Sequence, residues 1–409
     1  MTSSDRMSGV QLFFLWFGAA VSVAEMLTGG MLADLGLTRG LWANVVGHAL
    51  GCGLLVLGGL VGWRERLPAI RSMRLSFGAQ GSYLLSVLNV LQLVGWTAVM
   101  VMLGGSALAG LWAQMAGPAP EPVFAGVVGL LVAVWVFFGV RGFKRLNTAA
   151  VVLLFGLTVA LTVLLLRHGL PEAAWAPAGG SFSLGLELAV IMPLSWFPLI
   201  ADYTSLAESR RAAWLGPLAG YFLGSVWMYG IGLVGAAQTG QADPSAMLVA
   251  AGLGAVALAI VGLSTVTTTF LDVWSAAVSS QNVRPRLSAR WAAVGFALLG
   301  TGLGAFFPME RYEWFLYLLG SVFAPIVAIL LVDAFVLGED RRGRAADPAA
   351  FLALALGVAF YYVVQPLDPP AGPTLCTVAF SGAAHLGLRL GERALRGRIF
   401  ACQGAAKKL

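Results

Sequence analysis

The chain has 409 residues, of which 59% are hydrophobic and 11% are charged, and its mean hydropathy is +0.84. Soluble domains carry roughly 25% charged residues, so this composition excludes an ordinary soluble protein and indicates an integral membrane protein. The formal net charge is +6, but membrane orientation explains the basic residues, and no nucleic-acid partner is predicted.

Apolar runs long enough to cross a bilayer as helices recur along the whole chain, and their length excludes a barrel, whose strands need roughly 9–11 residues. The first run resembles a signal peptide, but it continues to about residue 37 and contains Glu25, so we interpret it as the first span. The sequence therefore predicts an all-α protein with twelve transmembrane helices, near residues 11–37, 41–62, 82–110, 123–140, 148–167, 182–203, 213–236, 251–280, 291–307, 313–337, 349–364 and 374–390.

Basic residues are distributed very unevenly between the two sides of these spans. With the N-terminus placed in the cytoplasm, the 25 Lys and Arg residues all fall inside except Arg39, Arg167 and Arg311. The positive-inside rule then predicts a plasma (inner) membrane protein with both termini cytoplasmic and an even number of spans.

Two spans carry helix-weakening residues at mid-membrane. In the first span, Glu25 precedes a Thr-Gly-Gly sequence at 28–30, and in the sixth span Pro193 and Pro198 flank residues 195–196. Each proline removes a backbone donor and clashes with the preceding turn. Interrupted helices at corresponding positions of two halves are typical of inverted-repeat transporters, which bind substrate and ion at the interruption.

The third span presents Asn89, Gln92 and Trp96 at helical spacings of three and four. An amide that donates and accepts, beside a flat indole, suits a planar heteroaromatic ring. Trp196 in the sixth span is placed to cover the other face of such a ring. The alternative is that these tryptophans only pack or face the interface, as most of the 13 in the chain must.

The eighth span contains Ser264, Thr267 and Thr268, whose spacing brings three hydroxyl oxygens together on one helix face. Oxygen ligands suit a hard cation such as sodium, and carbonyls of an opened first span would complete the shell. The alternative is that these hydroxyls bond back to their own helix or join neighbouring helices.

Carboxylates within apolar runs are costly and usually mark a pathway. Glu25 lies mid-span and is the best candidate to meet a polar ligand, the alternative being a protonated or helix-capping side chain. Asp272 is the next candidate, or it bonds a neighbouring helix. Glu187, Asp202 and Asp333 lie near span ends, where a structural role is the better interpretation.

No nucleotide-binding loop or histidine cluster is present, and the three cysteines lack metal-site spacing. The chain has no sequence signal of an enzyme, and no cofactor is predicted beyond a coupling cation. Any active transport by this chain alone must use an ion gradient.

Four segments together carry a resemblance: residues 16–30, 77–100, 192–204 and 264–276. They resemble the nucleobase:cation symporter-1 family and, within it, the hydroxymethylpyrimidine permease (CytX-like) branch. The resemblance implies a LeuT-like fold of two inverted five-helix repeats with broken helices 1 and 6, and transport by alternating access with sodium or protons. The repeats would occupy residues 1–170 and 171–338, and residues 339–409 would form two extra helices and a basic tail.

The resemblance also implies site residues. The cation would be held by carbonyls of Gly18 and Val21 and by Ser264, Thr267 and Thr268. The substrate site would combine Trp96 as the stacking residue and Gln92 near the edge-reading position with Ser22, Glu25, Ser195 and Trp196. Asn89 and Asp272 are added from the residue patterns above, because the asparagine that some relatives have in the eighth span is not matched here, where the nearby polar residue is Asp272. Glu25 replaces a smaller residue, which favours a ligand whose exocyclic amine or hydroxymethyl group a carboxylate can bind.

The sequence thus predicts a symporter that imports 4-amino-5-hydroxymethyl-2-methylpyrimidine, a thiamine precursor, with sodium as coupling ion and a proton as the alternative. Its partners are this small molecule and the lipid bilayer, and no obligatory protein partner is inferred. The alternatives are a carrier of another nucleobase such as cytosine or of thiamine, a membrane-embedded enzyme, and a channel or scaffold.

Overall fold

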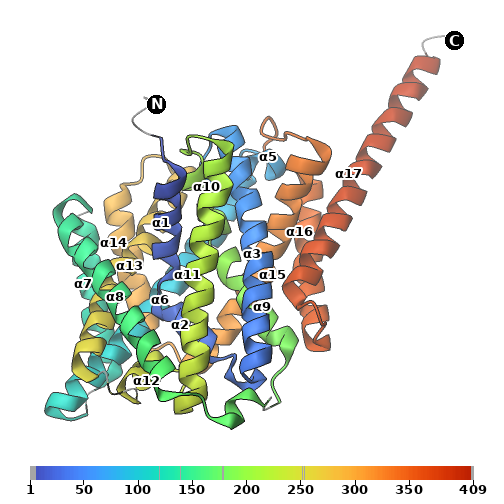
Figure 1. The fold of residues 1–409 in the computed structure, drawn as a ribbon. Helices are drawn as coiled ribbons and strands as arrows, with labels where there is room; N and C mark the ends of the chain where they lie inside the picture. The colour runs from blue at the N-terminus through green and yellow to red at the C-terminus, as the bar shows by residue number, and fades with distance from the viewer. Residues whose placement is uncertain are drawn as a thin grey trace.

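The computed structural model describes residues 6–118, 120–138, 140–176, 179–250, 252 and 254–406, and within them the side chains of 140–148, 150–151, 168, 173, 260, 263–264, 267 and 396–406 are left undescribed. Throughout this part the elements are helical (Figure 1). One isolated β-bridge joins Met7 to Ala207, ahead of the first and seventh predicted spans.

The long helices follow the predicted spans with shifted ends. In the first half they are α1 (Gly9–Ala20), α2 (Val23–Gly30), α3 (Leu37–Glu65), α6 (Ser82–Ala116), α7 (Glu121–Phe138) and α8 (Val140–His168). In the second half they are α9 (Phe182–Leu194), α10 (Phe197–Thr204), α11 (Arg210–Thr239), α13 (Gly254–Val283), α14 (Ala289–Gly304) and α15 (Tyr312–Leu331). Two further helices follow, α16 (Pro348–Val364) and α17 (Pro373–Ala406).

Shorter helices fill the connections. They are η2 (Ala33–Leu35), α4 (Ala69–Ser72), α5 (Arg74–Phe77), η3 (Glu172–Trp175), α12 (Pro244–Ala250), η4 (Met309–Arg311), η5 (Val332–Leu337), which is a π-helical turn, and η6 (Gln365–Leu367). The sequence analysis did not predict α12, which precedes the eighth span.

By length and composition, seven helices of the described part can each cross a membrane, and the bent pair α1 and α2–η2 raises that number to eight. The chain is therefore an integral membrane protein. The count of twelve spans stays a prediction.

The first span is divided at residues 21–22, where the chain bends by 57°. The Ser22 amide bonds the Ala20 carbonyl at 2.9 Å instead of the Gly18 carbonyl that a continuous helix would use. The Ser22 hydroxyl then caps α2 by accepting from the Glu25 amide at 3.4 Å. Local serine chemistry therefore restarts the helix at the bend.

The sixth span is interrupted more gently at residues 195–196, between α9 and α10. The Trp196 amide bonds the Pro193 carbonyl at 3.1 Å, which tightens the turn, and Pro198 occupies an early helical position that needs no donor. Residues Phe182–Thr204 still pass as one span. The interruption is therefore a local turn and lacks the sharp bend of the first span.

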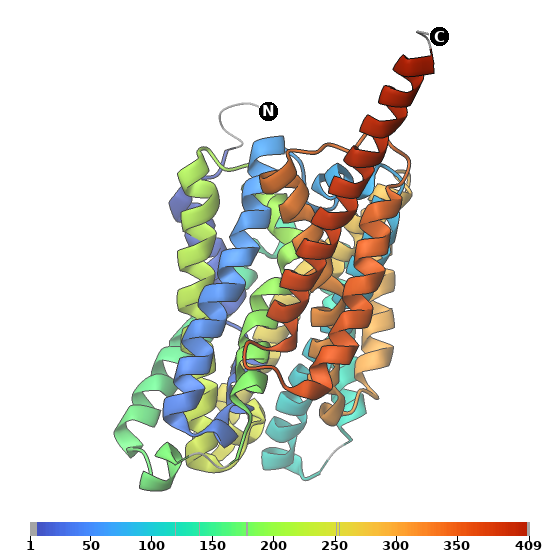
Figure 2. The same ribbon diagram turned by 90° about the vertical axis from the view of Figure 1, so that its right-hand side faces the viewer.

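The helices form two groups. One group consists of α1, α2, α3, α9, α10 and α11, which pack against one another, and the other consists of α6, α7, α13 and α14. Helices α16 and α17 lie outside these groups, and α17 extends beyond the body of the protein (Figure 2). The start of α1 and the end of α17 lie at the same end of the molecule (Figure 1).

Helix α11 contacts both pieces of the first span backbone to backbone. A Cβ at Gly220 would lie 2.3 Å from the carbonyl oxygen of Phe13 in α1, and one at Gly232 would lie 1.9 Å from that of Met26 in α2. Only glycine allows such an approach at these positions, as is common between membrane helices.

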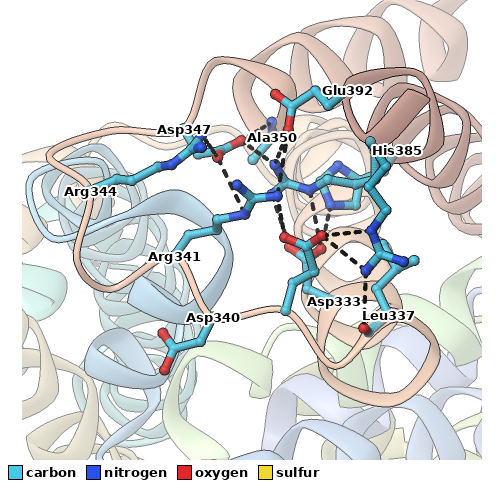
Figure 3. A network of polar contacts seen from close by, with 12 residues as sticks. Asp333, Leu337, Asp340, Arg341, Arg344, Asp347, Ala350, His385 and Glu392 are labelled. Carbon is cyan, nitrogen blue, oxygen red and sulfur yellow. Dashed lines mark hydrogen bonds and ion pairs between the residues drawn. The ribbon is translucent and has the colours of Figure 1, made fainter. Parts of the chain in front are cut away.

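A buried charge cluster attaches α17 to the rest of the fold. We call Asp333, Asp347, His385 and Arg389 the α15–α17 charge cluster (Figure 3). Arg389 bonds Asp347 at 2.8 Å and Asp333 at 3.3 Å, and His385 Nε2 lies 2.9 Å from Asp333. Asp347 also caps α16 by accepting from the Ala350 amide at 3.1 Å. Asp333 thus has the structural environment that its place near a span end suggested.

Candidate functional site

A cavity of about 340 Å³ lies between the two helix groups. This volume is within the usual range for small-molecule sites. Its wall combines both interrupted spans with α6, α7 and α13. The predicted site residues that line it are Gly18, Ser22, Glu25, Trp96, Ser195, Trp196, Thr268 and Asp272.

Three tryptophans line the cavity: Trp96 of α6, Trp135 of α7 and Trp196 at the sixth-span interruption. Trp96 of α6 meets the edges of Phe315 and Tyr312, with centroid distances of 5.3 and 6.3 Å. Trp196 meets Trp16 at 5.8 Å and an interplanar angle of 87°. Such edge-to-face packing fixes the orientation of these two indoles before a ligand arrives. That Trp96 and Trp196 enclose a ligand between them stays a prediction.

The two amides of α6 lie behind the cavity wall. Gln92 Nε2 donates to Asn89 Oδ1 at 2.8 Å and to the Ser195 carbonyl at 3.0 Å. Asn89 in turn donates to Ser279 of α13 at 2.8 Å. The amides therefore connect α6 to the sixth-span interruption and to α13. Gln92 Oε1 is buried and has no hydrogen-bond partner within the described part of the chain.

Oxygen atoms of the first and eighth spans approach the same cavity. Gly18 and Thr268 both line it, and the bend frees the Gly18 carbonyl from the Ser22 amide. Thr268 Oγ1 donates to the Thr265 carbonyl at 3.2 Å, and a hydroxyl oxygen that donates can also accept or ligate. Val21 lies in the bend, outside the cavity lining. This donor set fits a hard cation.

Two neighbouring hydroxyls of the eighth span have a different role, and two of the predicted cation ligands lie outside the described residues. Thr265 and Thr269 bond back to carbonyls of their own helix at 2.9 and 2.6 Å, as the alternative interpretation proposes for such hydroxyls. The side chains of Ser264 and Thr267 lie outside the described residues.

Glu25 has two hydroxyl neighbours on α11 and is only 2% exposed. Tyr221 donates to its Oε1 at 2.6 Å, and Ser225 Oγ lies 2.5 Å from its Oε2. Ser225 Oγ also lies 2.6 Å from Nε2 of His48 in α3. The sequence analysis missed these three partners. In the sequence, the one signal that could have pointed to these partners was His48, an isolated histidine in an apolar helix.

Asp272 reaches the cavity from α13 on the side opposite Glu25's helix. No hydrogen bond or ion pair to it is found among the described residues, and none of those lining the cavity is Lys or Arg. The cavity is therefore aromatic and acidic, which suits a ring that carries N–H donors.

The carboxylates near other span ends are satisfied within the protein. Glu187 accepts from the Thr374 amide at 2.8 Å, the Thr374 hydroxyl at 2.6 Å and Tyr361 at 2.8 Å. Asp202 accepts from the Ala69 amide at 2.9 Å. Both side chains therefore connect helices and loops, in agreement with the structural role suggested for them.

Comparison with known proteins gives relatives over most of the chain. Residues 2–352 match the family model described as permease for cytosine/purines, uracil, thiamine and allantoin. The cytosine permease of Escherichia coli (strain K12) is 28% identical over 373 residues, covering 87% of this chain and 86% of the relative.

Solved transporters share the fold. Mhp1, a nucleobase-cation-symport-1 family transporter in a closed conformation with bromovinylhydantoin bound, superposes with a TM-score of 0.79 at 18% identity, covering 94% of this chain and 93% of Mhp1. A Na⁺-coupled sialic acid symporter superposes with a TM-score of 0.69 at 12% identity, covering 94% of this chain and 89% of the symporter. The cavity between two helix groups, the LeuT-like fold and the extent of the family match lead to one conclusion: this chain belongs to the cytosine/purine, uracil, thiamine and allantoin permease family, and it is a membrane transporter, not an enzyme.

Proposed function

We propose that this permease imports a 4-aminopyrimidine across the plasma membrane together with a cation, with both termini in the cytoplasm. The expected substrate is 4-amino-5-hydroxymethyl-2-methylpyrimidine. Cytosine is the alternative, because it has the same 4-amino edge and is the substrate for which the Escherichia coli relative is named. The observation that carries the proposal is the cavity itself, with three tryptophans, two carboxyl groups and no Lys or Arg among its described lining residues.

In this proposal the ring stacks on Trp96, and Trp196 covers its second face. The amino group donates to Glu25 or Asp272, since carboxyl oxygens are the acceptors that line the cavity. Gln92 holds the sixth-span interruption through the Ser195 carbonyl. Ser22 and Ser195 complete the polar part of the wall, and Asn89 positions Gln92.

The coupling ion would be sodium, held by the Gly18 and Val21 carbonyls and by Ser264, Thr267 and Thr268. The sodium coupling named for the sialic acid symporter of the same fold supports this choice. An ion between the first and eighth spans contacts both helix groups. It shifts the conformational equilibrium only by its difference in affinity for the two states.

A binding panel tests the proposal. Thermal stabilisation of the purified protein is measured with hydroxymethylpyrimidine, cytosine, uracil and thiamine, with and without sodium, because a ligand that binds the folded state raises its stability. We expect stabilisation by hydroxymethylpyrimidine or cytosine that increases with sodium, and no response to uracil. Stabilisation by uracil alone, or by none of the four, contradicts the proposal.

A further inference from the structure

We propose that Glu25, Ser225 and His48, the Glu25 triad, form a proton-binding site in the cavity wall and that the transporter takes up a proton there when substrate binds. This inference extends the proposed function, since it adds a second coupling ion at a place separate from the sodium ligands. It rests on hydrogen-bond geometry in which each donor and acceptor can be assigned.

The assignment begins at His48. Its Nδ1 lies 2.8 Å from the Asn44 carbonyl oxygen. A carbonyl oxygen only accepts, so Nδ1 carries a hydrogen. The Asn44 amide group itself donates to the Val226 carbonyl at 3.0 Å, and the His48 ring packs edge-on against Tyr229 at 4.5 Å. The imidazole is therefore fixed in place, with Nε2 directed at Ser225.

Ser225 has a single hydroxyl hydrogen and two close neighbours, Glu25 Oε2 at 2.5 Å and His48 Nε2 at 2.6 Å. If His48 is neutral, Nε2 must accept, so Ser225 donates to it and can only accept from a protonated Glu25. If His48 is an imidazolium, Ser225 accepts from Nε2 and donates to a Glu25 carboxylate. Both arrangements contain the same extra proton, and they differ by the shift of one hydrogen along each bond.

Without that proton the contacts conflict. Oε2 and Nε2 would both be acceptors, and the one hydrogen of Ser225 could satisfy only one of them, which leaves a buried acceptor unpaired at close range. Tyr221 already donates to Oε1 at 2.6 Å and does not reach Oε2. The observed geometry is therefore that of the proton-loaded triad.

Among the described residues, no Lys or Arg is found facing Glu25. The ionisable groups that face Glu25 are Tyr221 and Tyr229 on α11, Cys52 on α3, Tyr312 on α15 and, across the cavity, Asp272 on α13. From α6 the uncharged Trp96 faces it, and the α12 sequence Pro244–Ala250 contains no ionisable side chain. Among the described residues, none forms an ion pair with Glu25. A buried acid without a cation favours its neutral form.

Glu25 also connects the triad to the transport cycle, because it lines the cavity while His48 and Ser225 are fully buried. Water in an open cavity reaches the carboxyl group and solvates its charged form. A bound neutral ring displaces that water and favours the protonated form. Binding of a neutral pyrimidine should therefore take up a proton, and affinity should rise as the pH falls.

A ligand-free experiment tests the site by itself. Infrared pH titration of the purified protein follows the carbonyl stretch of protonated carboxylic acids in wild type, Glu25→Gln, Ser225→Ala and the control Glu187→Gln, which alters a buried acid outside the cavity. We expect one band to disappear in Glu25→Gln, to change in frequency in Ser225→Ala because the hydrogen-bond partner of the acid is lost, and to persist in Glu187→Gln. An unchanged spectrum in folded Glu25→Gln and Ser225→Ala protein overturns the proposal.

A transport experiment tests the coupling. Proteoliposomes with equal sodium on both sides receive hydroxymethylpyrimidine or cytosine while an external pH dye is monitored. We expect the wild type to make the external medium more alkaline, and Glu25→Gln to reduce this signal at least tenfold. Ser225→Ala replaces Glu25→Gln in the experiment if Glu25→Gln does not fold. Sodium-driven uptake with no proton movement overturns this proposal and leaves the proposed function intact. A Glu25 acid band in a protein that takes up no pyrimidine contradicts the proposed function instead.

Discussion

Two buried acid–histidine clusters in this protein differ in one component. The α15–α17 charge cluster contains Arg389, which bonds both Asp333 and Asp347. The Glu25 triad contains no Lys or Arg, and its acid meets hydroxyl groups only. A guanidinium remains charged at every accessible pH and so fixes its partners as carboxylates. The comparison indicates that the first cluster holds helices together, whereas the second can change its charge.

The position of each cluster agrees with this difference. The α15–α17 charge cluster joins the π-helical turn after α15, the start of α16 and the middle of α17 (Figure 3), and none of its members lines the cavity. The Glu25 triad begins at the cavity wall. Substitutions in the first cluster should therefore change stability, and substitutions around the cavity should change binding and coupling.

The largest expected effect is that of Asp333→Asn. It removes the Asp333 charge from Arg389 in a fully buried site and leaves Asp347 and the more distant Glu392 as partners; loss of one partner of a buried ion pair costs about 3–5 kcal/mol. Thermal unfolding in detergent measures the change. Arg393→Gln is the control, because Arg393 is half exposed and pairs at the surface. Equal stability of Asp333→Asn and wild type would contradict the structural role that the comparison assigns to the α15–α17 charge cluster.

Trp96→Ala should weaken pyrimidine binding by roughly tenfold or more, since the loss of an aromatic contact of about 1.4 kcal/mol corresponds to a factor of ten. Titration calorimetry measures it. Trp42→Ala is the matched control, because Trp42 is 61% exposed on α3 and is not among the lining residues. Similar losses in both variants would show that Trp96 acts through folding.

Thr268→Val should reduce the sodium dependence of binding several-fold and leave sodium-free affinity unchanged, because it removes one oxygen and keeps the side-chain shape. Ligand binding measured across a sodium series shows the effect. Thr265→Val provides the control, since the Thr265 hydroxyl bonds its own helix at Val261. A normal sodium response in Thr268→Val would contradict the placement of the ion.

The α15–α17 charge cluster should also weaken in acid. Burial alone raises the pKa of Asp347, but the hydrogen bonds from Arg389 and the Ala350 amide outweigh it and hold the pKa below its usual value. Because the pKa of Asp347 is lower in the folded than in the unfolded state, its ionisation stabilises the fold at pH values above the ordinary pKa of Asp, about 3.9. This stabilisation is lost as the pH falls through the folded-state pKa. Melting temperatures across this range should fall in wild type and less so in Asp347→Asn.

The smallest effect on stability is expected for Glu25→Gln, below about 1 kcal/mol, because the amide imitates the protonated acid and can accept from Tyr221. The same unfolding assay as for Asp333→Asn measures it, so the two variants test the comparison directly. A loss as large as that of Asp333→Asn would mean that Glu25 is a charged structural residue.

Features encoded by local chemistry could be predicted from the sequence. Apolar length located the spans, and Pro193 marked a position where the helix stops, because a missing donor acts within one turn. In the first span the predicted weak point, the Thr-Gly-Gly sequence at 28–30, is helical, and the bend lies earlier, at residues 21–22, where Ser22 caps α2. Glu25 and Asp272 were found because a carboxylate in an apolar run is costly anywhere along the chain. Thr268 was found by spacing on a single helix.

Features that depend on packing between distant helices could not be predicted. His48 and Ser225 are 177 positions apart, and no pattern within α3 or α11 indicates that they meet. The placement of Gln92 behind the cavity wall likewise depends on the Ser195 carbonyl of another span. Substrate identity depends on the shape of the assembled cavity, so the sequence indicates a planar ring and leaves the specific pyrimidine open.

The glycine contacts of α11 bear on how the protein changes shape. Helix α11 is unbroken, and its backbone touches that of α1 at Gly220 and that of α2 at Gly232. It therefore holds the 57° bend between α1 and α2 in place. Flexing at Val21–Ser22 would have to pull one piece away from α11. In any rearrangement that keeps these contacts, α1, α2 and α11 move together as one rigid body. Relative motion is then confined to the boundary between this body and helices α6 and α13. Spin-label distances from α1 to α11 should accordingly stay constant through the cycle while those from α1 to α13 vary.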